Sequence, residues 1–291
     1  MLKNDRISKG KNYTVGLGIT SWKSYKTLKK TLDSYLNVGL FDFFDKSLIW
    51  FQDISEKDVD IAKEYKIDYA GGPNCGIAEG MRNLSKLLNT DFVLFLENDC
   101  AVIEDAGEIK KQLTSALNLL EKRDIDIMRL RHRWEFGEGF SIHKYSRYFP
   151  LYEKDENFIH EEYINKAPNF WKAVRRFFRS SKAEKLLGRS VYFEKNPHEL
   201  FSKYIKKDEE NQMFIIDSAV MNWTNQSVLC KKNFFLNVLM PYVDQYPCKR
   251  TSNGFQSPER ALNSEWWREQ HFKISVGRGL FTHARFDDSW R

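Results

Sequence analysis

The strongest structural signal in the chain is the segment Asp91-Phe92-Val93-Leu94-Phe95-Leu96-Glu97-Asn98-Asp99-Cys100. Five consecutive apolar residues are followed by three polar ones, and the apolar run is short, contains aromatic and β-branched residues and lacks glycine and proline. This composition favours a strand over a helix. A strand that is apolar on both faces is typical of a parallel sheet covered by helices on both sides. We therefore expect an α/β fold in which Glu97 and Asp99 stand at the carboxyl end of a buried strand.

The two acids at this strand end form a candidate metal site. Ligands of open α/β sheets bind beyond the carboxyl ends of the strands. Glu97 and Asp99 are two residues apart, so both side chains can point the same way while the chain is extended. Two carboxylates that face a crevice suit Mg²⁺ or Mn²⁺ bridging to a phosphate. The alternative is that Asp99 caps the next helix and Glu97 is solvated.

Composition limits the class of protein. With 291 residues, 42% of them apolar and 30% charged, the chain has the make-up of a globular protein. No apolar run approaches the roughly 20 residues that span a bilayer, and the polar, basic residues 1–11 do not resemble a signal peptide. The four cysteines have no CxxC spacing, which indicates a reducing compartment and neither a zinc site nor a disulfide scaffold. We expect a cytoplasmic protein, and its formal charge of +6 is compatible with anionic substrates or with association at the cytoplasmic face of a membrane.

Strands and helices alternate before and shortly after this segment. Such alternation predicts βαβ units and a largely parallel central sheet flanked by helices. The predicted strands are 13–20, 46–52, 67–70 and 125–130, and the predicted helices are 25–36, 57–65, 77–88 and 109–120.

The rhythm is lost between residues 131 and 212. This stretch is rich in aromatic and basic residues, and we interpret it as an insertion that covers the site. Regular patterns return with strands at 213–220 and 227–230, a helix at 231–239, a helix that starts at Ser257-Pro258, and a closing strand at 272–276.

Four short segments follow one another in the first third of the chain. They are Ile19-Thr20-Ser21-Trp22, Gln52-Asp53-Ile54-Ser55, Asn74-Cys75-Gly76-Ile77-Ala78-Glu79-Gly80-Met81-Arg82-Asn83 and Phe95-Leu96-Glu97-Asn98-Asp99. In this order they resemble family 2 glycosyltransferases, which have the Rossmann-like type A fold, and the fourth segment is a variant of the family's Asp-x-Asp motif. The resemblance implies one glycosyltransferase domain over 1–291, with a nucleotide-sugar-binding half at 13–130, the insertion at 131–212 and an acceptor and catalytic half at 213–291.

The resemblance implies roles in binding the nucleotide. Asp53 corresponds to an acid that contacts the base, whereas Thr20 and Trp22 line the base and ribose. Arg82 corresponds to an arginine that reaches toward the nucleotide and its phosphates. The simpler alternatives are that Asp53 caps a helix, Trp22 belongs to the core and Arg82 is a solvated helix charge.

The resemblance also implies a metal site. Asp99 matches the acid that holds the metal, while Glu97 takes the place of an acid that usually faces the ribose or donor sugar and is a second candidate ligand. His283, in Phe281-Thr282-His283-Ala284-Arg285, corresponds to a histidine that completes the metal site or contacts the diphosphate. Imidazole suits Mn²⁺, and Arg285 is a candidate for neutralising the diphosphate. The alternative for His283 is a structural or simply exposed side chain.

The catalytic base is less well defined by the pattern. Pro258-Glu259-Arg260 has the spacing of the family's Glu-Asp pair, of which the second acid is often the base. Arg260 cannot accept a proton, so Glu259 is the preferred base. Glu265 and Asp217 are the alternates, and Glu259 could instead serve the helix dipole.

The resemblance implies a metal-dependent transferase that moves a sugar from a UDP- or GDP-type donor to a hydroxyl of a glycan or a lipid-linked acceptor, with inversion. The cofactor would be Mn²⁺ or Mg²⁺. Two alternatives remain open. A sugar nucleotidyltransferase would need a Gly-rich loop after the first strand, for which Gly16-Leu17-Gly18 is a weak match. A non-catalytic carbohydrate- or membrane-binding module is favoured by Arg260.

Phe170–Arg179 carries aromatic and basic residues at helical spacing. One side of the expected helix gathers the apolar residues Phe170, Trp171, Val174, Phe177 and Phe178, and the other side gathers the basic residues Lys172, Arg175, Arg176 and Arg179. The two interpretations are a peripheral membrane contact through the aromatic side, or a helix docked on the core with its basic side in water. No motif for nucleic-acid binding accompanies these charges, so we expect no nucleic-acid partner.

Overall fold

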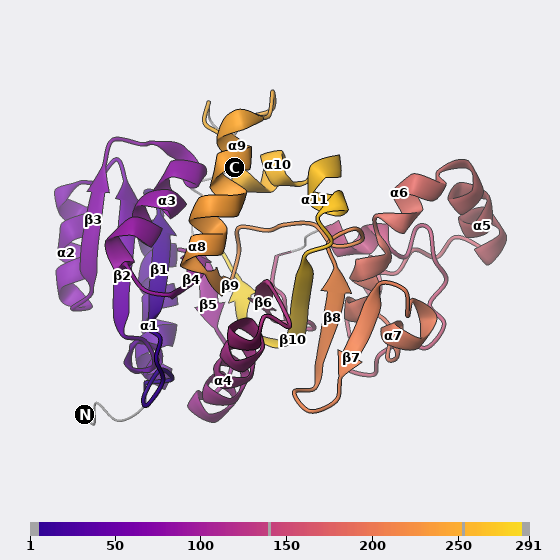
Figure 1. Cartoon of the computed structure of the whole chain (residues 1–291), viewed down its shortest axis with the longest axis horizontal. Coiled ribbons are helices and arrows are strands. Elements are labelled where there is room, and N and C mark those ends of the chain that lie inside the picture. Colours follow the sequence, from indigo (N-terminus) through magenta and orange to yellow (C-terminus); the bar gives the residue numbers. More distant parts are fainter. Residues whose placement is uncertain (1–5, 139–140, 252–253, 287–291) are drawn as a thin grey trace.

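The computed structural model describes residues 6–138, 141–251 and 254–286. Its N-terminal part alternates strands and helices as the sequence predicts (Figure 1). The elements are β1 (Val15–Ser21), α1 (Tyr25–Val38), a 3₁₀ turn η1 (Leu40–Phe43), β2 (Lys46–Gln52), α2 (Glu56–Glu64), β3 (Asp68–Gly72), α3 (Gly76–Leu88), β4 (Phe92–Glu97), β5 (Cys100–Val102), α4 (Ala106–Lys122) and β6 (Ile127–Arg131).

The C-terminal part contributes short helices and four further strands. The helical elements are η2 (Ser141–Lys144), η3 (Glu161–Tyr163), α5 (Asn169–Phe178), α6 (Ser180–Glu184), η4 (Leu187–Tyr192), α7 (Pro197–Leu200), α8 (Lys232–Phe234), the π-helix η5 (Phe235–Leu239), α9 (Met240–Gln245), α10 (Pro258–Leu262) and α11 (Glu265–Glu269). The strands are β7 (Ile205–Asp208), β8 (Met213–Asp217), β9 (Val228–Lys231) and β10 (Lys273–His283). Among the described residues, no helix is both long enough and apolar enough to cross a membrane.

All strands belong to one 10-stranded sheet with the order β3-β2-β1-β4-β9-β6-β10-β8-β7, and β5 pairs with β10. The pairs within β3-β2-β1-β4 and the pair of β6 with β10 are parallel. The other pairs are antiparallel because β9, β8 and β5 run against their neighbours. The predicted class is confirmed: helices flank a Rossmann-like sheet, which is parallel in its N-terminal half and mixed beyond it.

The strand β4 is buried on both faces, as its apolar run predicts. Phe92, Leu94 and Leu96 belong to the core cluster that includes α1, α2 and α4. Val93 and Phe95 belong to the other cluster, which includes α3 and much of the segment 131–212. Side chains alternate between the faces of a strand, so a strand between two helical layers needs apolar residues at every position. The polar residues that follow mark the point where the strand leaves the core.

The last strand is longer than the sequence predicts. Instead of a closing strand at 272–276, β10 continues to His283 and changes register against β6 between Val276 and Phe281. Gly279 permits this irregularity because its φ is +90°, and a Cβ at that position would lie 2.4 Å from the carbonyl oxygen of Arg131. The first half of β10 therefore pairs with β6 and β8, and its end reaches β5 next to Asp99.

Residues of the segment 131–212 form part of the molecule's core. Phe136, Tyr145, Phe158 and Phe193 are fully buried in the same cluster as α3 and β4, and β7 extends the sheet beside β8. Figure 1 shows the helices α5, α6 and α7 at the end of the molecule opposite α2 and β3. The segment 131–212, which we interpret from the sequence as an insertion, is therefore integrated with the sheet at its base and projects at its outer end.

Candidate functional site

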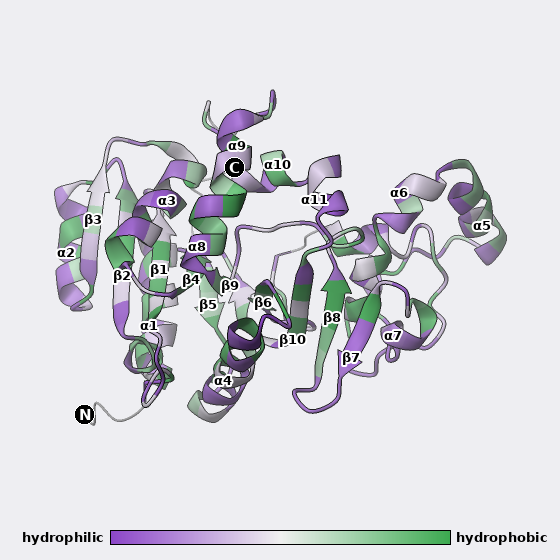
Figure 2. Ribbon diagram, viewed as in Figure 1, coloured by the Kyte–Doolittle hydropathy of each residue, from purple (hydrophilic) through white to green (hydrophobic). Residues whose placement is uncertain are grey.

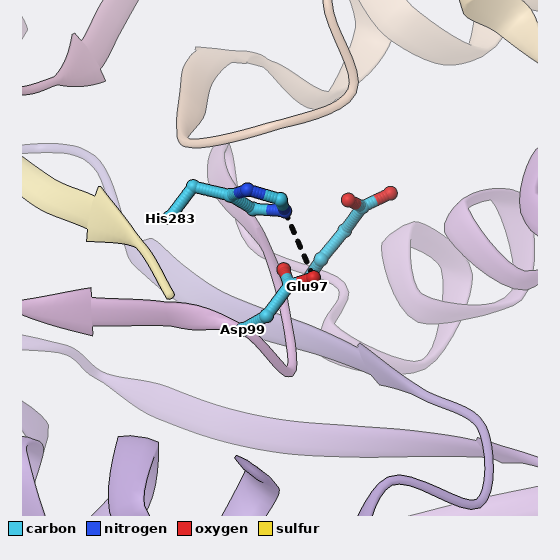
Figure 3. A group of neighbouring side chains, drawn as sticks. All are labelled: Glu97, Asp99 and His283. Carbon is cyan, nitrogen blue, oxygen red and sulfur yellow. Dashed lines mark ion pairs between the residues drawn. The ribbon is translucent and has the colours of Figure 1, made fainter. Parts of the chain in front are cut away.

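The ends of β4 and β10 bring together Glu97, Asp99 and His283 (Figure 3). One ligand atom from each of these side chains lies within 4.8 Å of the others. The chain turns tightly after Glu97 into β5, and the antiparallel pairing of β5 with β10 sets His283 opposite Cys100. This register places His283 Nε2 2.9 Å from Asp99 Oδ2. The local pairing of three strands thus assembles the cluster that the sequence predicts as a metal site.

The two acids of this cluster have different electrostatic surroundings. Burial opposes ionisation of Asp99, but its interactions with His283 and Arg285 outweigh the effect of burial and lower the pKa of that carboxyl. Arg285 Nε donates to Asp99 Oδ2 over 3.1 Å. Removal from bulk water, with the nearby charges of Asp99 and Glu259, raises the pKa of Glu97 to about 8. Acids whose pKa values are pushed apart in this way are typical of functional sites.

The polar groups of the cluster fit a divalent cation. His283 Nε2 is buried and forms no hydrogen bond of normal geometry despite its closeness to Asp99, and Asn98 Nδ2 is buried without a partner among the described residues. A carboxylate oxygen and an imidazole nitrogen form a donor set that suits Mn²⁺. On the other side of the ring, Glu138 Oε2 lies 4.0 Å from His283 Nδ1. A carboxylate behind a ligand histidine is a common way to orient the ring toward a metal.

A first cavity, of about 180 Å³, opens beside the cluster. It brings together five residues that the sequence predicts as binding residues, namely Thr20, Trp22, Glu97, Asp99 and Arg285. They come from the ends of β1, β4 and β10, which lie at one edge of the sheet because β1 and β4 are parallel. The other residues of the lining are Ser21, Gln52, Asn74, Gly76, Ile77, Asn98 and Phe255.

Asp53 supports the wall of this first cavity and is absent from its lining. Its carboxylate accepts hydrogen bonds from the indole Nε1 of Trp22, over 3.0 Å, and from the backbone N–H of Asn74, over 2.9 Å. Lys23 Nζ lies 3.5 Å away. The hydrogen bonds from Asn74 and Trp22 lower the pKa of Asp53, so it is ionised at neutral pH. In this structure Asp53 holds two lining residues in place.

The N-terminus of α3 forms the opposite wall. Gln52 fixes it, because its amide donates to the Gly76 carbonyl and accepts from the Cys75 N–H, both over 2.9 Å. Gly76 has a φ of +77°, and a Cβ there would lie 2.2 Å from Cβ of Phe255. Glycine therefore allows the aromatic ring of Phe255 to close over the helix start.

A second cavity, of about 280 Å³, adjoins the cluster on the side of His283 and Glu259. Glu259 lies in the first turn of α10, where it lines this cavity and is exposed to solvent. Contact with the surrounding protein partly desolvates its carboxyl group and raises its pKa, an effect that Arg129 and Arg131 partly offset. The remaining residues of the lining are Glu138, Ser141, Arg189, Tyr192, Met221, Asn222, Trp223, Thr224, Gln226 and Asn263.

The two cavities meet at the cluster. Glu97 and Asp99 line the first cavity, whereas His283 lines the second. Gln226, which lines the second cavity, donates from Nε2 to Glu97 Oε2 over 3.3 Å. A ligand in one cavity and a ligand in the other would therefore approach each other beside the same three side chains.

Besides Asp53, three of the residues predicted from the sequence lie outside both cavities. Arg82 points toward α9, where Nη2 lies 2.6 Å from Asp244 Oδ1. Glu265 is exposed and pairs with Lys185 over 2.9 Å. Asp217 binds His271 Nδ1 over 2.8 Å and accepts from the backbone of Ala219 at the end of β8. The structure does not bring these three side chains to the cluster of Glu97, Asp99 and His283.

Several lining residues were not among the sequence predictions. Asn74, Gly76 and Ile77 lie in the third motif, so the part of that motif that reaches the first cavity is its beginning and not Arg82. Gln52 precedes Asp53 in the second motif, so its place in that motif could also have identified it as a lining residue. No motif contains Arg129, Arg131 or Arg189, so no sequence pattern pointed to these arginines of the second cavity.

A scan against models of known protein families finds no match, and a search of curated protein sequences finds none. Among solved structures, the chain is similar to S. aureus TarS 1–349, with 10% identity and a TM-score of 0.46 over 93% of this chain and 60% of that one. It is similar to mannosyl-3-phosphoglycerate synthase from Rubrobacter xylanophilus, with 12% identity and a TM-score of 0.37 over 58% of this chain and 53% of that one. It is also similar to the mannosyltransferase PcManGT from Pyrobaculum calidifontis in complex with GDP-Man and Mn²⁺, with 8% identity and a TM-score of 0.34 over 42% of this chain and 36% of that one.

The chain thus spans only 53% and 60% of the length of the first two of these solved chains. With identities of 12% or less, the roles of individual residues depend on the contacts within this molecule and not on correspondence with those structures.

Proposed function

We propose that this chain is a metal-dependent glycosyltransferase that moves a sugar from a UDP- or GDP-type nucleotide sugar to a hydroxyl of a glycan or lipid-linked acceptor. The observation that carries the proposal is the grouping of Glu97, Asp99 and His283 within 4.8 Å at the junction of two cavities. A metal site between two cavities suits a reaction in which the leaving nucleoside diphosphate occupies one cavity and the acceptor attacks from the other.

The first cavity would hold the nucleotide. Trp22 and Phe255 offer aromatic surface for a base, and Thr20 and Asn74 add polar groups beside it. Asp99, His283 and, after losing its proton, Glu97 would hold Mn²⁺ or Mg²⁺. When bound, the cation supplies Lewis-acid neutralisation of the charge on the leaving diphosphate. Arg285 would contribute a fixed positive charge at the same place.

Glu259 would act as the general base. It lines the second cavity together with His283, and its raised pKa moves it closer to the range in which a carboxylate takes a proton effectively. It would accept the proton of the acceptor hydroxyl as that oxygen attacks the anomeric carbon. A single displacement of this kind inverts the anomeric centre and needs no protein nucleophile.

Nucleotide binding that requires metal is the direct test. We expect UDP or GDP to raise the melting temperature by roughly 5 °C at 100 times its Kd when Mn²⁺ is present, since ligand binding to the native state stabilises it. Without metal we expect almost no shift. Differential scanning fluorimetry with UDP, GDP, ADP and CMP, each with Mn²⁺, Mg²⁺ or EDTA, makes the measurement. An equal shift in EDTA would contradict the proposed site.

A turnover assay that measures the products released from nucleotide sugars separates the alternatives. A glycosyltransferase releases nucleoside diphosphate from its donor slowly in water and faster with an acceptor, and both need the metal. A sugar nucleotidyltransferase would instead consume a sugar 1-phosphate and a nucleoside triphosphate and release pyrophosphate. A non-catalytic module would release no nucleotide under either condition.

We further propose that α5 contacts an anionic lipid surface. The aromatic side of this helix faces solvent, with exposed fractions of 69% for Phe170, 55% for Trp171, 81% for Phe177 and 78% for Phe178. Its opposite side faces the protein, where Lys172 is buried. In one of the two interpretations of the sequence, the aromatic side docks on the core. The exposure of the four rings contradicts this interpretation.

Charge and position support lipid as the occupant. Residues 166–185 contain seven basic residues and one acidic residue, which complements anionic headgroups. The helix lies at an outer end of the molecule, and Figure 2 shows hydrophobic and hydrophilic positions side by side along it. Aromatic side chains flanked by basic ones are typical of helices that lie in a bilayer interface.

Vesicle sedimentation tests this contact. We expect the chain to bind vesicles of phosphatidylglycerol and phosphatidylcholine, and the double variant Phe177→Ser/Phe178→Ser to bind at least about 100-fold more weakly, because each ring that enters the interface contributes about 1.5–3 kcal/mol. The control Leu87→Ser removes another exposed apolar side chain, 51% exposed on α3, and should bind as the wild type does. Equal binding by the double variant, or equal binding to pure phosphatidylcholine, would contradict an anionic lipid contact through α5.

A further inference from the structure

The second cavity contains an unusual concentration of positive charge. Arg129 and Arg131 lie two residues apart on β6, so their side chains leave the same face of the sheet and both reach the cavity. Arg189, from η4 in the segment 131–212, lines the same cavity. Arg129 and Arg131 are only 9% and 8% exposed. Three guanidinium groups from two distant parts of the chain therefore converge on one cavity.

Two of these groups lack a carboxylate partner among the described residues. Arg189 Nη1 donates to the carbonyl oxygen of Ser141, and Arg129 Nη1 lies 2.8 Å from the sulfur of Met221, a weak acceptor. Arg133 on the same stretch of chain provides the contrast. It is as buried as Arg131, but its guanidinium lies 3.1 Å from the carboxylate of Asp155.

Burying an arginine guanidinium costs free energy unless a nearby anion compensates its charge. Buried arginines in proteins are normally paired with anions, because removal from water disfavours an isolated charge. Burial, together with the neighbouring charge of Arg129, lowers the pKa of Arg189 to about 10, which leaves it protonated at neutral pH. The acids that line the cavity are Glu138, whose side chain is 47% exposed, and Glu259, whose pKa is raised. Positive charge therefore exceeds negative charge in the lining.

We propose that the second cavity binds an anionic group, a phosphate or a carboxylate, carried by the acceptor substrate and held by Arg129 and Arg189. This inference deepens the proposed function, on which its assignment to the acceptor rests. Guanidinium forks match the oxygen geometry of both anions and form strong, charge-assisted hydrogen bonds with them. The neutral groups of Asn222, Thr224 and Asn263 in the same lining provide partners for hydroxyls. The anion would hold the acceptor so that one of its hydroxyls lies beside Glu259.

The donor is the other source of an anion, through its diphosphate. Two observations favour the acceptor. The first cavity, which contains Trp22, Asp99 and Arg285, shares no lining residue with the second. Arg285 already contacts the metal cluster from that first cavity, so the diphosphate has a positively charged partner there. An experiment that measures both ligands separately distinguishes the two sources.

The test uses ligand-observed NMR titration of the full chain with sn-glycerol 3-phosphate and D-glycerate as anionic probes and glycerol as the neutral probe. Titrations are made with and without saturating UDP or GDP and Mg²⁺. We expect both anions to bind at least tenfold more tightly than glycerol and to remain bound when the nucleotide is present. Arg129→Gln and Arg189→Gln should each weaken the anions about tenfold or more, because each removes a hydrogen bond to a charged group, and should leave the nucleotide affinity unchanged.

Two further variants keep the result interpretable. Arg189→Lys keeps the charge but loses the fork, and we expect it to retain part of the affinity. Arg278→Gln changes an arginine that lies outside both cavities and pairs with Glu104, and it should bind every probe as the wild type does. Displacement of the anions by the nucleotide, weaker nucleotide binding in the arginine variants, or anion binding no tighter than that of glycerol would overturn the inference. If the nucleotide fails to bind while the anions still do, the proposed function fails and the anion site remains.

Discussion

Replacing Asp99 by alanine is expected to remove metal-dependent nucleotide binding and to lower kcat/KM at least about 100-fold. The physical reason is that Asp99 is the only one of the two strand-end acids whose surroundings favour the ionised form, through His283 and Arg285. In the proposed site, loss of this carboxylate would remove a ligand of the cation, and a bound cation contributes several kcal/mol to stabilising charge in the transition state. The measurement is the thermal shift with UDP or GDP and Mn²⁺, followed by steady-state kinetics of donor turnover.

The control must show that the effect is local. Asp99→Asn keeps the shape of the side chain and should lose nearly as much activity, because it removes the negative charge. Glu64→Gln removes a carboxylate that pairs with Lys29 over 2.7 Å on the exposed side of α2, and it should retain full activity. A metal-dependent shift that is the same in Asp99→Ala as in the wild type would remove Asp99 from the metal site.

The substitution Glu259→Gln is expected to lower kcat about 10²–10⁴-fold while the metal-dependent thermal shift with nucleotide stays unchanged. Glutamine keeps the size of the side chain but cannot take a proton from the acceptor. In the wild type, activity should fall on acidification as Glu259 binds a proton. Since removal from bulk water raises the pKa of Glu259, this decline should begin at a higher pH than for a freely exposed glutamate, whose pKa is 4.5.

The alternates from the sequence provide matched comparisons for the base. Glu265 and Asp217 have other partners, Lys185 and His271, and neither lines a cavity that contains the metal cluster. Glu265→Gln and Asp217→Asn should therefore keep kcat within a few fold of the wild type. A large loss of kcat in either variant, with normal turnover in Glu259→Gln, would transfer the role of base to that residue.

Local patterns in the sequence were sufficient for the N-terminal half of the fold. The bounds predicted for β2 agree with the structure, and those for β1, α1, α2 and α3 differ from it by three residues at most at either end. This agreement arises because a buried strand and an amphipathic helix each leave a periodic signal in consecutive residues. The same signal failed for the end of β10, because the irregularity at Gly279 interrupts the strand pattern and the predicted strand ended at residue 276.

The candidate site was predicted only in part, because motifs report residues and not the direction of side chains. Five of the predicted binding residues line the first cavity, but Arg82 points to Asp244 and Asp53 is engaged by Trp22 and Asn74. The start of α3 lines the first cavity, whereas Arg82 lies more than one helical turn further along and points away from it. Whether a polar side chain faces a ligand depends on neighbours that are distant in the sequence.

The sequence by itself determined that β4 is buried on both faces, that acids follow it, and that α5 is amphipathic, because all three properties reside in neighbouring residues. Only the tertiary structure decided that His283 lies 2.9 Å from Asp99, since this requires β5 to pair with a strand from the end of the chain. It also decided that the aromatic side of α5 faces outward, since Arg176 donates to the carbonyl oxygen of Tyr148 on the inner side. An amphipathic pattern specifies two faces, but the groups that surround a helix select the face that packs.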